Sequence, residues 1–282
     1  MIDLLLGGSP CQGFSFAGKQ LNFFDPRSKL FFDYVKALEI LKPKYFLLEN
    51  VKMKKEYEDV ITQHLGVKPI EINSALVSAQ NRVRLYWTNI PGVKQPEDKG
   101  ILLKDIIDDG FVEKEKSWCM LESWNRFPKS TESAIGRYNR CMMLVVFKTP
   151  DFDFCKGWRE LNISECEKLQ TIPVGYTSVV NVKIAKSLLG NGWTVDVIAH
   201  ILSFIPETYL HTVVSLFDGI SCGQVALERA GKIYNQYYAS EIDKDAIAVT
   251  QKNYPHTMQL GDVTKIDWNA FLDRLDLIQK VS

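Results

Sequence analysis

Residues 212–223 read Thr-Val-Val-Ser-Leu-Phe-Asp-Gly-Ile-Ser-Cys-Gly, and this stretch decides the fold class. Its first six residues form an apolar run typical of a buried strand, and its last six form a glycine-bearing loop. Gln224 to Ala230 predicts the start of a helix, and Tyr237 to Ser240 predicts a further strand that ends at Glu241. An acidic residue about 20 residues past such a loop is typical of the βαβ form of a nucleotide-cofactor site.

A second strand, helix and strand open the chain. Ile2 to Leu6 predicts a buried strand that runs into Gly-Gly-Ser-Pro, Leu30 to Leu41 has apolar residues at helical spacing, and Tyr45 to Leu48 predicts the next strand. Ile70 to Asn73 and Arg84 to Asn89 predict two strands that pair as a hairpin-like edge. The alternation predicts an α/β fold with a largely parallel sheet.

Composition excludes several classes of protein. The chain has 282 residues, 46% of them hydrophobic, with 34 Lys+Arg against 34 Asp+Glu, which excludes disorder and collagen-like repeats. No run of 18 apolar residues and no signal peptide is visible, so we expect a cytoplasmic protein without a membrane partner. The six cysteines form no C-x-x-C pair, so we expect free thiols and no metal site. Zero net charge means that any polyanionic partner must bind to a local basic patch.

Two polar groups follow strands of the first unit. Cys11 lies in the loop Gly8 to Ser15, at the carboxyl end of a strand, where open α/β sheets place their ligands. A partly exposed thiol there favours a nucleophile, and the alternative is a small buried hydrophobic residue. Glu49, with Asn50 and Val51, ends the next strand, so its carboxylate would point into the same crevice; the alternative is a capping or solvated acid.

An arginine pair comes from the stretch Gln80-Asn81-Arg82-Val83-Arg84. Alternate residues of an extended stretch project to one face, so both guanidinium groups would lie together. There they could bind a phosphate or orient a planar base, and the alternative is ordinary surface charge.

The middle of the chain, residues 93–157, has weak periodicity and accumulates tryptophan and basic residues. We expect a small second domain here, with a regular pattern only from Met142 to Phe147. Helices are then predicted around Ser164 to Leu169, from Asn181 to Leu189 and from Thr194 to Ile205, with a break at Gly190-Asn191-Gly192.

Taken in order, these motifs resemble the cytosine C5 DNA methyltransferase family. Pro10-Cys11-Gln12 resembles the nucleophile motif of the family, Glu49-Asn50-Val51 its acid motif, and Gln80-x-Arg82-x-Arg84 its third active-site motif. Two later motifs and three cofactor motifs also match, at Arg159 to Gln170, Gly190-Asn191-Gly192, Leu216 to Gly219, Ser240-Glu241 and Gly261-Asp262-Val263. The chain resembles the animal de novo branch most closely in the sequences of two motifs, Leu-Phe-Asp-Gly and Gly-Gly-Ser-Pro-Cys, and in Trp193 after Gly192.

The motif order departs from the family, because the cofactor motifs usually come before the cysteine motif. The resemblance therefore implies a circularly permuted class I S-adenosylmethionine-dependent methyltransferase, with a Rossmann-like mixed sheet and a small target-recognition domain. The expected division is a catalytic half at 1–92, target recognition at 93–157, returning helices at 158–211 and a cofactor half at 212–282. Asp276-Leu277-Ile278 echoes Asp3-Leu4-Leu5, but only the first copy is expected in the sheet, because the cysteine must follow that strand directly.

The resemblance also implies an activity. This is transfer of a methyl group from S-adenosylmethionine to C5 of a cytosine flipped out of double-stranded DNA, through a covalent bond between Cys11 and C6. Such enzymes occur in restriction-modification systems of prokaryotic or phage type. Rival interpretations are an RNA cytosine methyltransferase, which the absence of a Cys-Phe-Thr tripeptide disfavours, and a catalytically inactive DNA- or partner-binding homologue.

Site residues are carried over motif by motif. The catalytic set implied by the resemblance is Cys11, Glu49, Arg82 and Arg84. The implied cofactor set is Pro10, Leu30, Asn191, Phe217, Asp218, Gly219, Gly223, Glu241, Ile242, Asp262 and Val263. The implied substrate-binding set is Gln12, Ser15, Asn50, Gln80, Arg137 and Arg140. No motif indicates the target sequence or the oligomeric state.

Overall fold

The computed structural model describes residues 2–9 and 30–281 and contains a seven-stranded sheet in the order β3-β4-β2-β1-β7-β8-β9. The strands are β1 (Leu4–Gly7), β2 (Tyr45–Val51), β3 (Ile70–Asn73), β4 (Val83–Thr88), β7 (Tyr209–Leu216), β8 (Ile233–Ser240) and β9 (Met258–Gln259). β4 runs antiparallel to its neighbours β2 and β3, whereas β2, β1, β7, β8 and β9 are parallel. The prediction of an α/β fold with a mixed sheet is confirmed.

Helices cover both faces of this sheet because successive strand residues point to opposite sides. Leu5 of β1 packs with Val214 of β7 in one cluster, whereas their neighbours Leu4 and Val213 belong to the other. The first cluster contains helices α1 (Leu30–Leu41), α2 (Lys55–Leu65) and α9 (Trp268–Val281). The second contains α6 (Val195–Ser203), α7 (Cys222–Arg229) and α8 (Lys244–Asn253). The sheet is therefore the middle layer of three.

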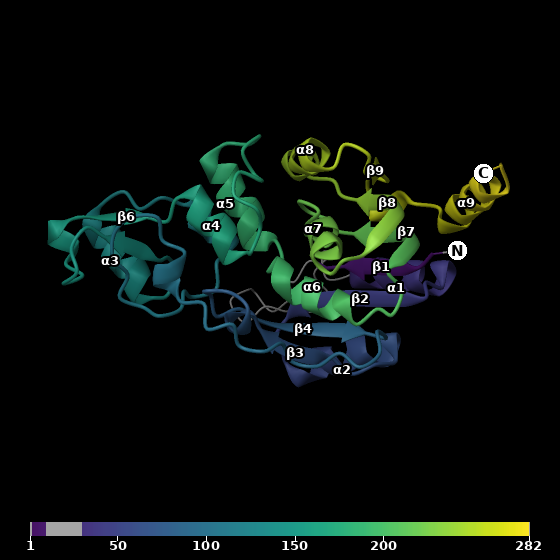
Figure 1. The fold of residues 1–282 in the computed structure, drawn as a ribbon, viewed down its shortest axis with the longest axis horizontal. Coiled ribbons are helices and arrows are strands. Elements are labelled where there is room, and N and C mark those ends of the chain that lie inside the picture. The colour runs from purple at the N-terminus through teal and green to yellow at the C-terminus, as the bar shows by residue number, and fades with distance from the viewer. Residues whose placement is uncertain (1, 10–29, 282) are drawn as a thin grey trace.

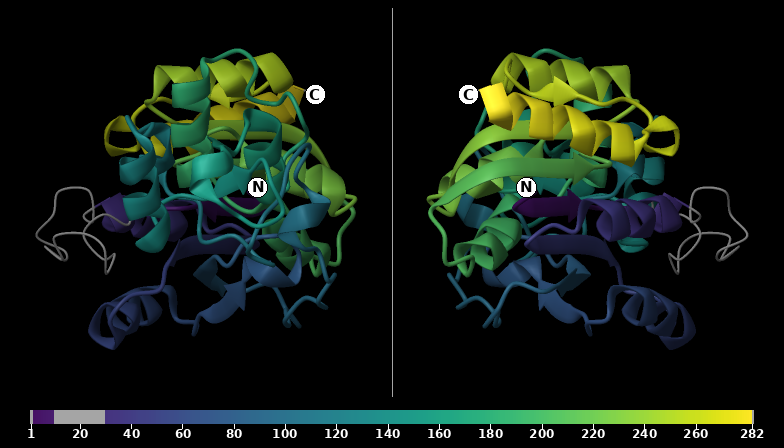
Figure 2. Two further views of the ribbon diagram at one scale, coloured as in Figure 1. Left: turned by 90° about the vertical axis from the view of Figure 1, so that its left-hand side faces the viewer. Right: turned by 90° about the vertical axis from the view of Figure 1, so that its right-hand side faces the viewer.

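The two ends of the sequence meet inside the sheet. β1 pairs in parallel with β2 on one side and with β7 on the other, and Figure 2 shows the purple β1 between them. The chain leaves β1 through α1 on one face, but it leaves β7 through α7 on the opposite face. The boundary between β1 and β7 is therefore the topological switch point, where doubly wound sheets form a crevice.

A second, two-stranded sheet lies at one end of the molecule, away from the main sheet (Figure 1). β5 (Val145–Phe147) pairs antiparallel with β6 (Trp158–Glu160), and α3 (Thr131–Asn139) lies beside them in Figure 1. The small helices α4 (Ile163–Leu169) and α5 (Val182–Asn191) stand between the two sheets in the same view. β6 begins one residue past the expected end of the middle region at 157, so this hydrogen-bonded pair crosses that boundary.

Short 3-10 turns complete the described structure. They are η2 (Ser74–Leu76), η3 (Leu103–Asp105), η4 (Glu122–Asn125), η5 (Phe154–Lys156) and η6 (Val263–Lys265). Several of them begin with an aspartate or asparagine whose side chain accepts the hydrogen bond of a backbone N–H, as Asp153 does for η5 and Asp262 for η6.

Several details differ from the sequence-based expectations: β8 begins at Ile233, and α8 and α9 were not predicted. β2 continues to Val51 because β4 pairs with it as far as that residue, so Glu49 lies within the strand. α2 was not predicted, since its four acidic and basic residues at the start obscure an apolar face of Ile61 and Leu65. α5 includes Gly190 and Asn191, so the break falls at Gly192. α3 forms within the supposedly irregular middle region.

The fate of the two similar tripeptides is as predicted. Leu4 and Leu5 lie in β1, and Asp276 to Ile278 lie in α9. α9 packs against α1, on the face opposite to α7. The N-terminal copy is therefore the one that pairs into the sheet.

Candidate active site

β1, β7 and β8 end level with one another at the switch point, and β2 passes them at Leu48 before it continues to Val51. Gly7 of β1 lies opposite Leu48 of β2 and Leu216 of β7, and Leu216 lies opposite Ser240 of β8. The residues that come next are therefore neighbours along one edge: Gly8, Glu49, Phe217 and Glu241. We call this line of residues the crevice edge. It brings together segments that lie more than 200 residues apart in the sequence.

The Glu49 carboxylate is held at both oxygens. Arg84 Nε lies 3.0 Å from Oε1, in an ion pair whose side chains are 13% and 12% exposed. The indole Nε1 of Trp193 donates to Oε2 at 3.1 Å. Glu49 therefore lies in a largely desolvated place, and its carboxylate has a fixed orientation.

The segment that leads toward Cys11 is fixed at Ser9. The buried side chain of Asn50 donates through Nδ2 to Ser9 Oγ at 3.1 Å and to Ser9 O at 3.4 Å. Asn50 also accepts a hydrogen bond from the backbone N–H of Val51 at 2.8 Å. Asn50 thus ties the end of β2 to both the side chain and the backbone of Ser9, two residues before Cys11. Pro10, Cys11, Gln12 and Ser15 lie outside the described residues.

The Arg82 guanidinium hydrogen-bonds to backbone carbonyls. It is 4% exposed and donates to Met120 O at 2.9 Å and to Gly192 O at 2.8 Å. Gln80 is also fully buried; its Nε2 donates to Leu169 O at 2.8 Å, and its Oε1 accepts from Met120 N at 3.1 Å. These contacts correct the expectation that both touch the base or DNA, because neither has free polar surface. They connect the segment just before β4 to the middle region, to the end of α4 and to the end of α5.

The loop after β7 has the backbone of a ligand-binding loop. Phe217, Gly219 and Ser221 have φ of 58°, 58° and 57°, and a Cβ placed on Gly219 would meet no atom within 4 Å. Positive φ at the non-glycine residues Phe217 and Ser221 is strained and persists only where the surroundings enforce it. The loop therefore presents open backbone at the start of α7.

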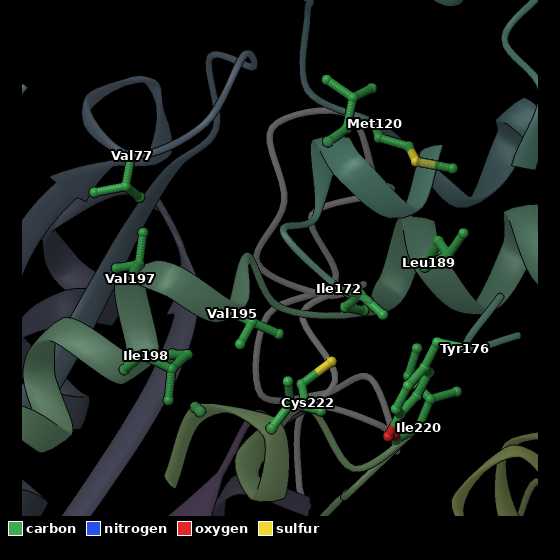
Figure 3. Packing of buried hydrophobic residues seen from close by; sticks show 14 of the residues in the cluster. Val77, Met120, Ile172, Tyr176, Leu189, Val195, Val197, Ile198, Ile220 and Cys222 are labelled. Carbon is green, nitrogen blue, oxygen red and sulfur yellow. The ribbon is translucent and has the colours of Figure 1, made fainter. Parts of the chain in front are cut away.

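Asp218 enforces that conformation from inside. Its carboxylate accepts from Tyr237 OH at 2.7 Å and from the Ser221 hydroxyl. Burial raises the pKa of Asp218 to about 6, although the hydroxyl donors oppose the shift. The Tyr176 hydroxyl donates to Ile220 O at 2.7 Å, and Figure 3 shows the Tyr176 ring beside Ile220. Asp218 thus braces the loop rather than offering its carboxylate to a ligand.

Glu241 is a half-buried acid directly after β8. Its Oε2 accepts from Gly219 N at 2.8 Å, and its Oε1 accepts from Ile242 N at 2.7 Å and from Asp243 N at 2.8 Å. The adjacent Ile242 is 71% exposed, which is unusual for a large apolar side chain directly after a buried strand. A fixed carboxylate, an exposed apolar surface and an open glycine loop fit the ribose, adenine and amino-acid parts of S-adenosylmethionine.

Of the other expected cofactor residues, some are buried in the core and others keep exposed surface. Gly223 is a packing residue, since a Cβ there would lie 2.7 Å from Tyr237 Oη and 2.8 Å from Leu6 Cδ1. Asp262 caps η6, and its hydrogen bonds to Thr264 lower its pKa. Val263 is buried, Leu30 begins α1, which packs against η6, and Asn191 is exposed at the end of α5.

The expected substrate-binding arginines of α3 differ in availability. Arg137 donates through Nη2 to Ser123 O at 3.0 Å and through Nη1 to Arg126 O. Arg140 is exposed at the end of the helix. Figure 1 places α3 far from the crevice edge.

Sequence reasoning missed two residues next to the catalytic set. Trp193 was noted only as a family marker, although its position directly after the Gly190-Asn191-Gly192 motif could have indicated it. Cys119 comes from the middle region, and its Sγ lies 3.3 Å from Arg82 Nη1 and 3.8 Å from Arg84 Nη2. Burial raises the pKa of the Cys119 thiol, but the two guanidinium groups outweigh burial and lower it overall. No sequence pattern pointed to Cys119.

Among residues 2–9 and 30–281, no three His, Cys, Asp or Glu side chains are grouped so that they could hold a metal ion. The same part of the chain has no helix that is both long and apolar enough to cross a membrane.

Similarity to known proteins agrees with this geometry. The type II methyltransferase M1.ScrFI of Lactococcus lactis subsp. cremoris is 35% identical over 141 residues, which cover 41% of this chain and 36% of that protein. The orphan methyltransferase M.Rho11sI of Bacillus phage rho11s is 30% identical over 206 residues, covering 68% of this chain and 40% of that protein. The matched stretches therefore span well under half of each relative.

Two further matches concern structure and family. The crystal structure of S. pombe Dnmt2 methyltransferase aligns with a TM-score of 0.47 at 18% identity, covering 72% of this chain and 78% of that one. The sequence profile of the C-5 cytosine-specific DNA methylases matches residues 1–90 and 211–280, which together are more than half of the chain. Those two segments carry the strands of the crevice edge, and the chain belongs to the C-5 cytosine-specific DNA methylase family.

Proposed function

We propose that this protein transfers a methyl group from S-adenosylmethionine to C5 of cytosine in double-stranded DNA. The observation that carries the proposal is the common register of β1, β2, β7 and β8, which aligns the acid motif, the start of the cysteine motif and the cofactor loop along one edge. Relatives that match the chain are named as type II or orphan methyltransferases of bacteria and a phage. A place in the cytoplasm of such a cell, where the DNA lies, follows from the same proposal.

The proposed cofactor pocket uses the second half of the chain. Glu241 would bind the ribose hydroxyls, Ile242 would pack on the adenine, and the backbone from Phe217 to Gly219, at the start of α7, would face the methionine carboxylate. Asp262 and Val263 would close the adenine side, with Leu30 and Asn191 at the border. Bound there, S-adenosylmethionine supplies an electrophilic methyl group.

The proposed chemistry uses the first half. C5 of cytosine is a weak nucleophile, so the Cys11 thiolate would first form a bond to C6, which makes C5 electron-rich. Glu49 would hold N3 and the exocyclic amine while charge develops on the ring, and Arg84 would keep Glu49 in place. After methylation, loss of the C5 proton would break the C6–S bond and regenerate the thiolate.

Access to the cytosine requires DNA contacts. The base must leave the duplex stack, which costs a few kcal/mol. We propose that the middle region, residues 93–157, forms the target-recognition domain, with exposed basic residues such as Arg140 on phosphates. Asn50 would act indirectly by fixing Ser9, while Arg82, Arg137 and Gln80 would hold the recognition elements in place.

We also infer that the motif order is circularly permuted. The family profile matches two separate segments with the active-site motifs first, and β7 completes the sheet beside β1. A short connection from α6 to β7, residues 204–208, is enough to join the two halves. This supports a sheet of ordinary connectivity whose chain begins at a different strand.

The test is transfer of labelled methyl from S-adenosylmethionine to duplex DNA and, separately, to tRNA. Labelled DNA is the expected result, with turnover by Cys11→Ser reduced at least about 10³-fold because the hydroxyl is a far weaker nucleophile. Cys155→Ser, at an exposed thiol, serves as the matched control and retains turnover. Labelling of tRNA alone would contradict the proposal in favour of an RNA enzyme, and labelling of neither would favour an inactive homologue.

A further inference from the structure

Trp193 lies where the acid motif meets the segment that carries the cysteine. Its indole N–H donates to Glu49 Oε2 at 3.1 Å. A Cβ placed on Gly8 would lie 2.9 Å from Nε1 and 3.3 Å from Cε2 of the same ring. The indole therefore rests on the backbone of Gly8, three residues before Cys11, while it holds Glu49. One side chain contacts both parts of the proposed chemistry.

The backbone on each side of Trp193 is fixed by other elements. The carbonyl of Gly192 accepts from Arg82 Nη2 at 2.8 Å. The Thr194 hydroxyl bonds to Gln170 Oε1 at 3.0 Å and accepts from Ser74 Oγ at 3.0 Å. The carbonyl of Trp193 itself lies 4.0 Å from Cys222 Sγ, at the first residue of α7. Because these contacts come from the segment before β4, from η2, from the end of α4 and from α7, the indole has a defined direction.

The hydrogen-bond chemistry of the two Glu49 partners is restrictive. An indole N–H and a guanidinium N–H are donors only, so each Glu49 oxygen accepts from a group that cannot reverse its role. Two donors on two oxygens fix the plane of the carboxylate. A single donor would leave the carboxylate free to rotate about the Cγ–Cδ bond. The plane matters because Glu49 must face the edge of a flat base.

We propose that Trp193 is a positioning residue of the methyl transfer: its N–H sets the plane of the Glu49 carboxylate, and its ring keeps Gly8 at a fixed separation from that carboxylate. The inference rests on the proposed function for its effect on rate. Its structural part, the Trp193–Glu49 bond, stands apart from any activity. Replacement by Phe removes the N–H and leaves a smaller aromatic ring beside Gly8.

The first experiment reads the bond directly, in the full-length protein, from the indole N–H resonances in a ¹H–¹⁵N spectrum. Trp193→Phe and Trp87→Phe assign the two signals of interest. Trp87 is the matched control, since its Nε1 donates to Thr62 Oγ1 at 3.0 Å and not to a carboxylate. In Glu49→Gln we expect the Trp193 signal to move upfield and the Trp87 signal to stay. An unmoved Trp193 signal would overturn the proposal.

The second experiment reads the consequence in single-turnover methylation of duplex DNA. We expect Trp193→Phe to lower the rate about 10- to 100-fold, with the Kd for S-adenosylmethionine within about twofold of wild type. Trp87→Phe should retain the wild-type rate even where its Tm falls. In a Glu49→Gln background, Trp193→Phe should lower the rate much less than in the wild-type background, because its hydrogen-bond partner is already altered.

Equal rate losses in both tryptophan variants, or additive losses with Glu49→Gln, would show that Trp193 has only a general structural role and would refute the positioning role. Absence of methyl transfer by the wild-type protein would instead refute the proposed function. In that case the resonance measurement alone decides whether Trp193 holds Glu49.

Discussion

The crevice edge and the middle region both carry charged side chains, yet they use them differently. Along the crevice edge, Glu49 and Glu241 are each held by a few hydrogen bonds and keep some exposed surface. In the middle region, Lys116 donates to three backbone carbonyls and Arg137 to two. The comparison teaches that a count of basic residues overstates the surface available to DNA, because a buried or half-buried cation replaces missing backbone partners.

The largest effect is expected at the crevice edge itself. Glu49→Gln should lower the single-turnover methylation rate about 10²- to 10³-fold, because the neutral amide cannot stabilise the charge that develops on the base. The Kd for S-adenosylmethionine should stay near that of wild type, since Glu49 lies on the other side of the switch point. If the Kd for S-adenosylmethionine rose as the rate fell, the crevice edge would not divide into separate catalytic and cofactor parts.

Asp218, directly after Phe217, differs from these two acids because its carboxyl is buried and supports the loop. Burial raises its pKa to about 6 from 3.8, so between about pH 4 and pH 6 the folded protein keeps a proton that the unfolded chain has lost. The unfolding free energy therefore falls as the pH rises through this window, by at most about 2–3 kcal/mol from this group. Denaturant titrations of wild type and Asp218→Asn at several pH values should show the difference between them changing only there. A constant difference from pH 4 to pH 7 would place the pKa of Asp218 outside this window.

Arg137 sharpens the comparison from the middle region. Arg137→Met should lower the unfolding free energy by about 1–2 kcal/mol, because the carbonyls of Ser123 and Arg126 lose their donor. The methylation rate at a temperature well below the Tm should change little, because Arg137 uses its guanidinium on these internal carbonyls and not on DNA. Chemical denaturation measures the change in unfolding free energy. A loss of DNA affinity without a change in stability would show that Arg137 contacts DNA and is not an internal support.

Arg140, on the same helix, should give the smallest effect and the opposite pattern. Arg140→Met removes an exposed cation, so stability should stay within about 0.5 kcal/mol of wild type. DNA affinity should fall a few-fold, and the salt dependence of binding should weaken by about one phosphate contact. Binding titrations at several salt concentrations test this, and an unchanged slope would remove Arg140 from the DNA surface.

Much of the fold was readable from local pattern. The apolar runs before Gly8, Glu49 and Phe217 identified β1, β2 and β7, because a parallel strand buried on both faces is continuously apolar. The 3.6-residue spacing placed α1 at its observed bounds, Leu30–Leu41. α2 was missed because its charged residues lie on a broad exposed face, and α3 was missed because its nine residues bury only Ala134 and Tyr138.

The candidate site was readable only as a set of residue types. The alternation Gln80, Arg82, Arg84 predicted three side chains on one face, whereas only Arg84 lies within β4, and the pattern could not say which of them would be covered. Burial depends on elements from elsewhere: the backbone at Met120 and the end of α5 cover Gln80 and Arg82, and only Arg84 reaches Glu49. Trp193 and Cys119 could not be placed beside Glu49 and Arg84 without that packing.

The sequence by itself determined the strands, the loops that end them and the family of the chain, because these depend on residues close together in the chain. The tertiary structure decided which polar groups stay available and which become internal supports. The physical reason is that a hydrogen bond or a desolvated surface needs a partner, and here many partners are distant in the sequence, up to 144 residues for Trp193 and Glu49. No local pattern encodes such distances, whereas the register of β1 between β2 and β7 sets them all at once.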